Sequence, residues 1–275
     1  MLKRTLSGAV LTLVTAAALI EGRYLLIIFL LATSLVGQFE LYRVVGSSGL
    51  DKKRREPLAL CGYLSAVIYY IALFGGAGEL TLFLMFPVFM VVMMLIYVFS
   101  YPKYEPIDLF SVFFGLIYLP VMLSAVYMLR QSENGLYLVW FVFIGSWVCD
   151  TCAYFVGSAM GRHKLAPVLS PKKSIEGAVG GVLGSAIVGA LFGWFLQTRT
   201  VGAADPGRTA VFVLISALAA VFSQAGDLTA SAIKRHYGIK DYGELIPGHG
   251  GVLDRFDSMI VTAPLVYLVV VLAGL

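Results

Sequence analysis

The sequence predicts an all-α, polytopic integral membrane protein with about nine transmembrane helices and a cytoplasmic N-terminus. Of its 275 residues, 59% are hydrophobic and only 13% are charged, whereas a soluble domain has about 25% charged residues. The mean hydropathy is +0.88, and the apolar residues fall in blocks of about 20, the length that crosses a bilayer. The polar stretches are too short for a large soluble domain. The chain also lacks a dense basic run with interleaved aromatic residues, so we expect no nucleic-acid partner.

The first apolar run, residues 6–20, follows Lys3 and Arg4. It has two interpretations, the core of a signal peptide or a short first span. We favour the span, because a second long apolar run begins at Tyr24. The other predicted spans are residues 24–45, 58–76, 80–100, 108–129, 136–157, 177–197, 210–232 and 258–275.

The basic residues predict the orientation of these spans. With the N-terminus in the cytoplasm, sixteen of the 20 Lys and Arg residues fall in cytoplasmic segments and four fall outside. This asymmetry is what the positive-inside rule expects. The basic stretch 51–56 is interpreted as a topology determinant that touches anionic lipid.

The polar residues divide the chain into two regions. Residues 1–135, with spans one to five, are expected to be a membrane scaffold. Residues 136–275, with spans six to nine and two cytoplasmic loops, are expected to be the catalytic region, because most of the polar chemistry lies there. The chain shows no convincing internal repeat, which argues against an inverted-repeat transporter.

Residues 231–257 are the most polar long stretch of this apolar chain. Asp227 precedes them on the eighth span, with Ser231 and Lys234 on the same helical face, and Asp254 and Asp257 open the ninth span. Three carboxylates that converge at a membrane boundary would repel one another without a cation between them. We therefore predict a divalent metal site with oxygen ligands. The alternative is an ion-pair network with Lys234 and Arg255.

The loop at residues 158–176 carries a second group of cations, including Lys172 and Lys173. Ser174 is predicted to cap the following helix, whose free amides could bind phosphate. Small residues recur every four positions along that helix and predict close helix packing; they are Gly177, Gly181, Ser185, Gly189 and Gly193.

Three further features have simpler interpretations. Asp150, with Tyr154 one turn later, is a possible extension of the polar site or a partner for a lysine. Glu40 is interpreted as a local ion pair with Arg43, three residues further along the helix. Cys149 and Cys152 lie in an apolar run, so we expect small buried residues and no redox or metal motif.

Residues 231–257 resemble the signature of the phosphatidate cytidylyltransferases, also called CDP-diacylglycerol synthases. The matching residues are Ser231, Ile233, Lys234, Arg235, Lys240, Asp241, Gly243, Ile246, Pro247, His249, Gly250, Gly251, Val252, Asp254, Arg255, Phe256 and Asp257. Two upstream elements are also similar to the family's, and are carried by Ser170, Pro171, Lys173, Ser174, Glu176 and Gly177 and by Asp150, Ala153 and Tyr154. The similarity covers about residues 145–260.

This resemblance implies an enzyme that converts CTP and phosphatidic acid into CDP-diacylglycerol and pyrophosphate. It implies Mg²⁺, with K⁺ as a further candidate beside it, a homodimer, and a bacterial cytoplasmic membrane with the active site on the cytoplasmic side. We expect catalytic roles for Lys234, Arg235, His249, Asp254 and Arg255. The predicted metal ligands are Asp227, Asp254 and Asp257. Substrate contacts are expected from Ser170, Lys173, Ser174, Glu176, Ser231, Lys240, Gly250 and Gly251.

Two other functions are compatible with the intramembrane carboxylates and cytoplasmic cations of this sequence. A related CTP-dependent lipid kinase would transfer the γ-phosphate instead and release CDP. An ion-coupled transporter would use intramembrane carboxylates without nucleotide, but the concentration of polar residues on one predicted side argues against it. The motif of the CDP-alcohol phosphotransferases is not found in the sequence.

Overall fold

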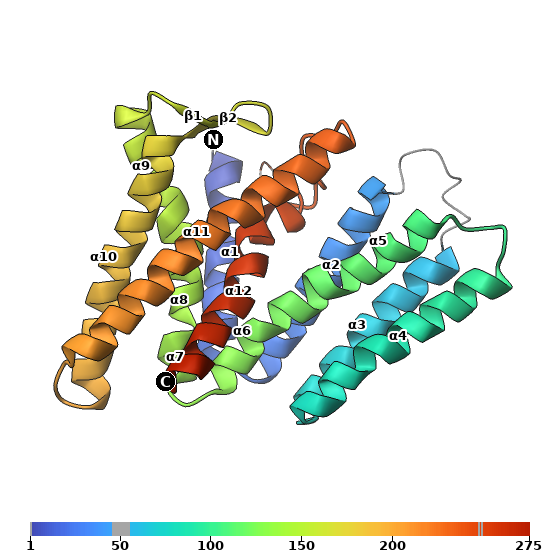
Figure 1. Ribbon diagram of the computed structural model, residues 1–275, viewed down its shortest axis with the longest axis horizontal. Coiled ribbons are helices and arrows are strands. Elements are labelled where there is room, and N and C mark those ends of the chain that lie inside the picture. Colours follow the sequence, from blue (N-terminus) through green and yellow to red (C-terminus); the bar gives the residue numbers. More distant parts are fainter. Residues whose placement is uncertain (1, 46–55, 247, 249) are drawn as a thin grey trace. The chain divides into compact units, whose positions relative to one another are not determined.

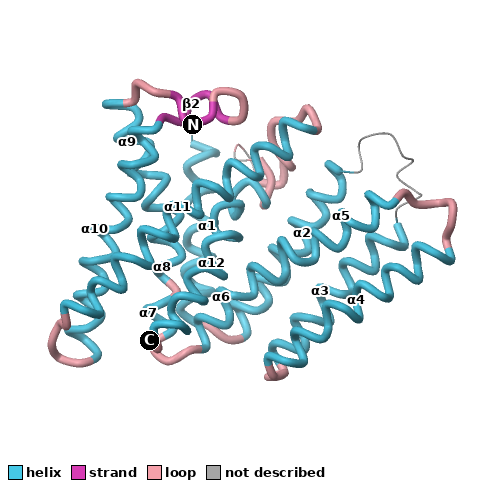
Figure 2. The backbone as a smooth tube through the Cα atoms, in the orientation of Figure 1, coloured by secondary structure: helices cyan, strands magenta, loops and turns pink. Residues whose placement is uncertain are grey.

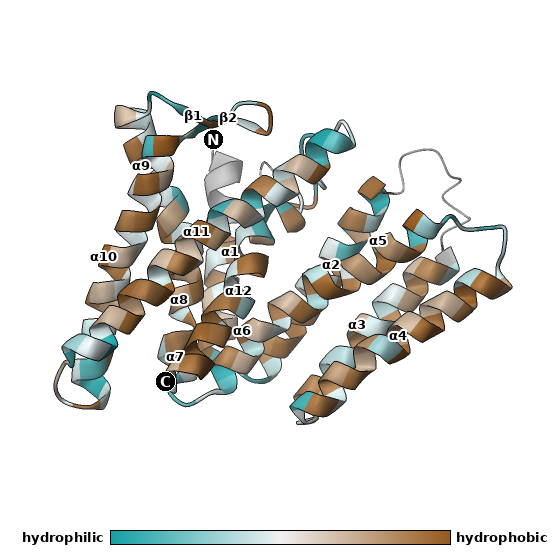
Figure 3. Ribbon diagram, viewed as in Figure 1, coloured by the Kyte–Doolittle hydropathy of each residue, from teal (hydrophilic) through white to brown (hydrophobic). Residues whose placement is uncertain are grey.

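The computed structural model describes residues 2–45, 56–246, 248 and 250–275. Its helices are brown along most of their length in Figure 3, where brown marks hydrophobic residues. Among the described residues, eight helices are long and apolar enough to cross a membrane, and Ser7–Glu21 is a shorter apolar helix. The polytopic, predominantly helical class is therefore confirmed. The nine expected spans correspond to eight long helices and this shorter one.

The chain divides into two compact units. Unit 1 contains residues 1–127 and 237–255, and unit 2 contains residues 128–236 and 256–275. This division differs from the two regions expected from the sequence, because residues 237–255 pack with the N-terminal helices. We call this segment loop 237–255.

Unit 1 is built from antiparallel apolar helices (Figure 1). They are α1 (Leu2–Glu21), α2 (Tyr24–Val45), α3 (Glu56–Phe74), α4 (Glu79–Phe99) and α5 (Pro106–Leu116), followed by the π-helical turn η2 (Ile117–Val121) and α6 (Met122–Gln131), which runs into unit 2. Pro120 lies within η2. The wider turn accommodates a residue that has no amide hydrogen for the helical ladder.

Hydrogen bonds between polar side chains and backbone connect the helices of unit 1. The Tyr42 hydroxyl donates to the Val112 carbonyl at 2.9 Å. A Cβ atom at Gly62 would lie 2.7 Å from that hydroxyl, so the glycine makes room for it. Outside this core the surface is apolar, and Phe99 at the end of α4 is 84% exposed, which suits contact with lipid rather than water.

Unit 2 contains the most closely packed helices. It comprises α7 (Gly135–Leu138), α8 (Trp140–Phe143), the π-helical turn η3 (Ile144–Val148), α9 (Cys149–Met160), α10 (Ile175–Thr200), α11 (Pro206–His236) and most of α12 (Leu253–Ala273). Two short strands, β1 (Lys164–Ala166) and β2 (Ser170–Ser174), form an antiparallel hairpin between α9 and α10 (Figure 2). The sequence predicted a loop at residues 158–176, where this hairpin lies.

The small-residue stripe of α10 packs as predicted. All five of its members are buried. A Cβ atom at Gly189 would lie 2.5 Å from the Ser216 Cβ atom and 3.2 Å from the Phe212 carbonyl oxygen, both on α11. Cys149 is buried as expected, whereas Cys152 is half-buried; both are free thiols.

This packing gives a stability prediction. Gly189→Val is expected to destabilise the protein by about 1–3 kcal/mol, because the added carbons overfill a closely packed interface. The measurement is the thermal unfolding midpoint in detergent. Ile187→Val is the control on the same helix, since Ile187 is 61% exposed; equal shifts for both variants would contradict the prediction.

Candidate active site

Unit 1 contains a pocket of about 990 Å³, within the usual size range of small-molecule sites. It is formed by the end of α2 and by loop 237–255. We call it the cationic pocket, and its lining residues are Arg43, Ile239, Lys240, Asp241, Gly243, Glu244, Ile246, Gly248, Gly250 and Arg255. The lining thus holds three cations, two carboxylates and three glycines, and its excess of cations favours an anionic ligand such as a polyphosphate.

Asp254 fixes the shape of loop 237–255. Its Oδ2 atom accepts hydrogen bonds from the Tyr242 amide at 2.7 Å and from the Gly251 amide at 2.9 Å. Gly250 has φ = +86°, a conformation that favours glycine, and the Ile246 amide donates to the Gly250 carbonyl at 3.0 Å. One carboxylate oxygen of the predicted metal ligand Asp254 therefore holds the loop.

The expected ion pair between Glu40 and Arg43 is not what the structure shows. The Glu40 carboxylate accepts instead from the Val252 amide at 3.0 Å and from the Leu253 amide at 2.8 Å. An Arg43 Nη atom donates to the Tyr242 carbonyl at 2.6 Å. Both side chains of α2 thus reach loop 237–255. The unpaired amides at the start of α12 are better partners for a buried carboxylate than a neighbour on its own helix.

Unit 2 contains a second charged cluster. Lys173 on β2 forms an ion pair with Asp227 on α11. Asp257, one turn into α12, is 8% exposed, and it interacts electrostatically with Asp227, Lys234 and Asp150. The pairing of Asp227 with Lys173 differs from the alternative network predicted with Lys234 and Arg255. It does bring the loop at 158–176 to the end of α11.

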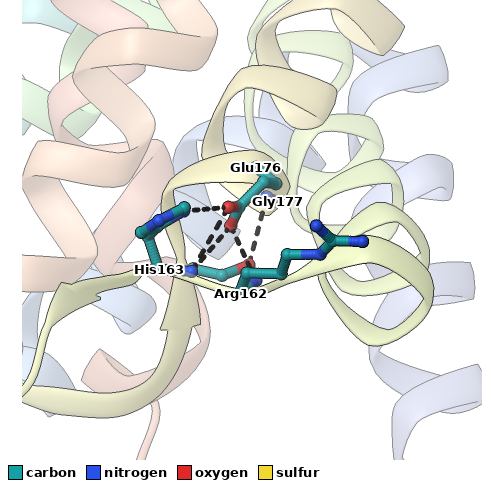
Figure 4. A network of polar contacts seen from close by, with 5 residues as sticks. Arg162, His163, Glu176 and Gly177 are labelled. Carbon is teal, nitrogen blue, oxygen red and sulfur yellow. Dashed lines mark hydrogen bonds and ion pairs between the residues drawn. The ribbon is translucent and has the colours of Figure 1, made fainter.

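The start of α10 holds that loop in place, as Figure 4 shows. The Glu176 carboxylate accepts from the Arg162 amide at 3.1 Å and from the His163 amide at 3.2 Å, and it also contacts the His163 ring at 2.6 Å. The Ser174 hydroxyl accepts from the Gly177 amide at 3.1 Å. This bond confirms Ser174 as the N-cap. Glu176 and Ser174 thus order the backbone that presents Lys173.

The remaining predicted site residues are placed as follows. Ser231 and Lys234 are buried on α11, and Arg235 is exposed at its end. Tyr154 is 71% exposed and packs against Phe155, whereas Asp150 belongs to the unit 2 cluster. Ser170 is half-buried on β2. His249, Pro247 and the basic stretch 51–55 lie outside the described residues.

The predicted metal site can be compared with these positions. Across the parts of the chain that the structure describes, no three His, Cys, Asp or Glu side chains are placed so that they could hold a metal ion. The donor chemistry nevertheless suits a hard cation: Asp227 and Asp257 supply carboxylate oxygens within one cluster of unit 2, and Mg²⁺ prefers such oxygens together with water and phosphate. The shared metal therefore stays a prediction.

Sequence reasoning missed the roles of Glu40 and Arg43. Arg43 lines the cationic pocket, and Glu40 is 3% exposed. The available signal was the carboxylate within an apolar helix, since such a group is costly there and needs a specific partner. Its partners lie more than 200 residues away in the sequence, so local spacing could not identify them.

The fold and the site define a polytopic membrane protein with a pocket lined by three cations. The Cytidylyltransferase family matches residues 2–273, and the chain belongs to this family. It is similar to the phosphatidate cytidylyltransferases of Staphylococcus epidermidis and Staphylococcus saprophyticus, with 32% identity over 98% of each chain. The corresponding protein of Staphylococcus haemolyticus is 38% identical over 55% of each chain.

Proposed function

We propose that this chain is a phosphatidate cytidylyltransferase, which transfers the cytidylyl group of CTP to phosphatidic acid in phospholipid biosynthesis. The observation that carries the proposal is the cationic pocket, whose lining includes Lys240, Gly250 and Arg255 of the family signature. The family membership and the full-length similarity to enzymes of that name support the same reaction.

The chemistry suits the residues present. A phosphate oxygen of phosphatidic acid attacks the α-phosphorus of CTP, and the bond from that phosphorus to the bridging oxygen of the β-phosphate breaks. Pyrophosphate leaves with the electron pair. A phosphate monoester is already anionic near neutral pH, so no strong general base is needed. Catalysis depends on positioning the two phosphates and on neutralising their charge.

In unit 1, Lys240 and Arg255 are assigned to phosphate contacts, and Arg43 joins them as a third cation of the pocket. Gly250 lets the backbone approach the ligand closely. Gly251, also predicted to contact substrate, is not among the described residues that line the pocket. His249 is assigned as a donor to phosphate. In unit 2, the cations Lys173, Lys234 and Arg235 neutralise phosphate charge. Ser174 and Glu176 order the backbone around Lys173. Substrate contacts remain the predicted role of Ser170, Ser174, Glu176 and Ser231.

Mg²⁺ is the proposed cofactor, with K⁺ as a second candidate. Asp227, Asp254 and Asp257 are the residues that would hold the metal, which when bound would offset the negative charge of the phosphates. The Oδ2 atom of Asp254 also accepts from the loop amides of Tyr242 and Gly251, so this carboxylate would hold the loop and the ion together. Asp227 would exchange its Lys173 partner for the ion.

The cellular setting is part of the proposal. The charge asymmetry of the sequence supports an N-terminus in the cytoplasm of a bacterial cell and an active site on the cytoplasmic side of its membrane, where water-soluble CTP meets a lipid substrate. A homodimer is expected from the family resemblance. Residues 1–135 are proposed to act mainly as scaffold, with Glu40 and Arg43 as exceptions.

One assay tests the reaction. Purified protein in detergent is given labelled CTP, phosphatidic acid and Mg²⁺, and both lipid and nucleotide products are identified. We expect labelled CDP-diacylglycerol and one pyrophosphate for each CTP consumed. Release of CDP with a newly phosphorylated lipid would indicate a lipid kinase instead. Nucleotide-independent ion flux in liposomes, without either product, would indicate a transporter.

A further inference from the structure

Glu40 is a buried carboxylate that the proposed chemistry does not use. It lies on α2, within an apolar helix, and its oxygens accept from the Val252 and Leu253 amides. These amides lie at the N-terminal end of α12, where no preceding turn supplies carbonyl partners. A negative charge at a helix N-terminus is favourable, since the helix dipole and the free amides both stabilise it.

Two glycines of the family signature make room for this carboxylate. A Cβ atom at Gly251 would lie 2.6 Å from each Glu40 carboxylate oxygen, and one at Gly243 would lie 2.9 Å from the Glu40 carboxyl carbon. Real Cβ atoms do not approach so closely. The nearest atoms to a Cβ atom at Gly251 all belong to Glu40, so the glycine at this position is explained by the side chain of α2.

Arg43 adds a second attachment one turn further along α2. It donates to the Tyr242 carbonyl at 2.6 Å, and the Tyr242 amide in turn donates to Asp254 at 2.7 Å. The Tyr242 side chain is fully buried. The two attachments therefore hold loop 237–255 at Tyr242 and at residues 252–253, on either side of the lining residues Gly243, Glu244, Ile246, Gly248 and Gly250.

We propose that Glu40 is a positioning residue for the active site, and that α2 sets the geometry of the cationic pocket through Glu40 with Arg43 as its companion. Glu40 acts through the backbone of residues 251–253 and not by contact with substrate. The consequence is that the backbone next to Asp254 and Arg255 depends on a helix of the N-terminal region. The activity test of this inference rests on the proposed function, whereas its hydrogen–deuterium exchange test does not.

The structural arm is hydrogen–deuterium exchange on the full-length protein in detergent. Glu40→Ala is expected to raise exchange within loop 237–255 and at the first turn of α12. The control is Glu21→Ala, because the Glu21 carboxylate caps α2 through the Arg23 and Leu25 amides at 3.1 and 2.7 Å. Glu21→Ala should raise exchange only at the start of α2. Unchanged exchange of loop 237–255 in Glu40→Ala would overturn the proposal.

The activity arm is a double-mutant cycle between Glu40 and Gly251, with kcat and KM for CTP measured on the folded fraction. Gly251→Ala alone is expected to lower kcat/KM by about 100-fold, the scale of a displacement of about 1 Å in a catalytic group. Added to Glu40→Ala, it should cause little further loss, because the obstructing carboxylate is gone. The same fold-loss in both backgrounds would overturn the proposal.

The design separates the two hypotheses. If the wild-type protein forms no CDP-diacylglycerol, the proposed reaction is wrong and the exchange experiment alone decides the role of Glu40. If Glu40→Ala does not fold, the exchange experiment is run on Glu40→Gln, which keeps the side-chain volume and one acceptor oxygen. Exchange of loop 237–255 should then rise by a smaller amount, and unchanged exchange would again overturn the proposal. A purely structural role predicts a lower melting temperature with kcat and KM unchanged in the folded fraction, and that result also overturns the proposal.

Discussion

Asp254→Asn is expected to lower the rate of CDP-diacylglycerol formation by about 100- to 1,000-fold, the scale on which one preorganised electrostatic group contributes to catalysis. The substitution removes a negative charge but keeps an acceptor oxygen. That oxygen can still receive the Tyr242 and Gly251 amides, which now donate to Asp254 at 2.7 and 2.9 Å. The fold of loop 237–255 should therefore survive while the charge is lost.

A second buried carboxylate provides the matched control. Asp108 is 4% exposed and accepts from the Glu105 amide at 3.0 Å at the start of α5. Asp108→Asn removes a charge in the same kind of setting, but away from the cationic pocket, so its rate should stay close to that of the wild type. Near-normal turnover in Asp254→Asn would contradict the assignment of Asp254 as a metal ligand.

The apolar pattern of the sequence was sufficient to predict the transmembrane helices. A helix in a bilayer must satisfy its own backbone and must be about 20 residues long, so its limits are encoded locally. The expected span at 24–45 agrees with α2 (Tyr24–Val45). Ser174 was also predicted correctly as a cap, because a capping residue and its amide partner are neighbours in the sequence.

The attachment of loop 237–255 to α2 could not be predicted in the same way. The helical spacing of Glu40 and Arg43 shows only that they could pair. Whether they do depends on competing partners, and the amides of residues 252 and 253 are such partners only after the chain has folded. The β1–β2 hairpin was missed because Pro, Lys and Ser in β2 are typical of loops, and its pairing depends on the ends of α9 and α10.

Lys173 and Asp227 were both predicted as site residues, but the ion pair between them was not predicted. The sequence predicts a phosphate contact for Lys173 and a metal contact for Asp227. The structure joins the two side chains directly. Each group neutralises a partner that would otherwise be partly buried without a counter-charge, which is unfavourable.

The pair gives the second large prediction. Asp227→Asn and Lys173→Ala are each expected to lower kcat/KM for CTP by about 100-fold or more. The double variant should be little worse than Asp227→Asn alone, because residues that act as a unit are not additive. Lys172→Ala, on the same strand but exposed, should cause a smaller loss.

The exchanged variant, Lys173→Asp with Asp227→Lys, separates a structural role from a chemical one. It restores opposite charges at the two positions, so the thermal unfolding midpoint should recover toward that of the wild type. Activity should not recover, because the proposed roles need a cation on β2 for phosphate and a carboxylate on α11 for the metal. If exchange restores the rate of CDP-diacylglycerol formation together with the stability, the ion pair is structural and Asp227 is not a metal ligand.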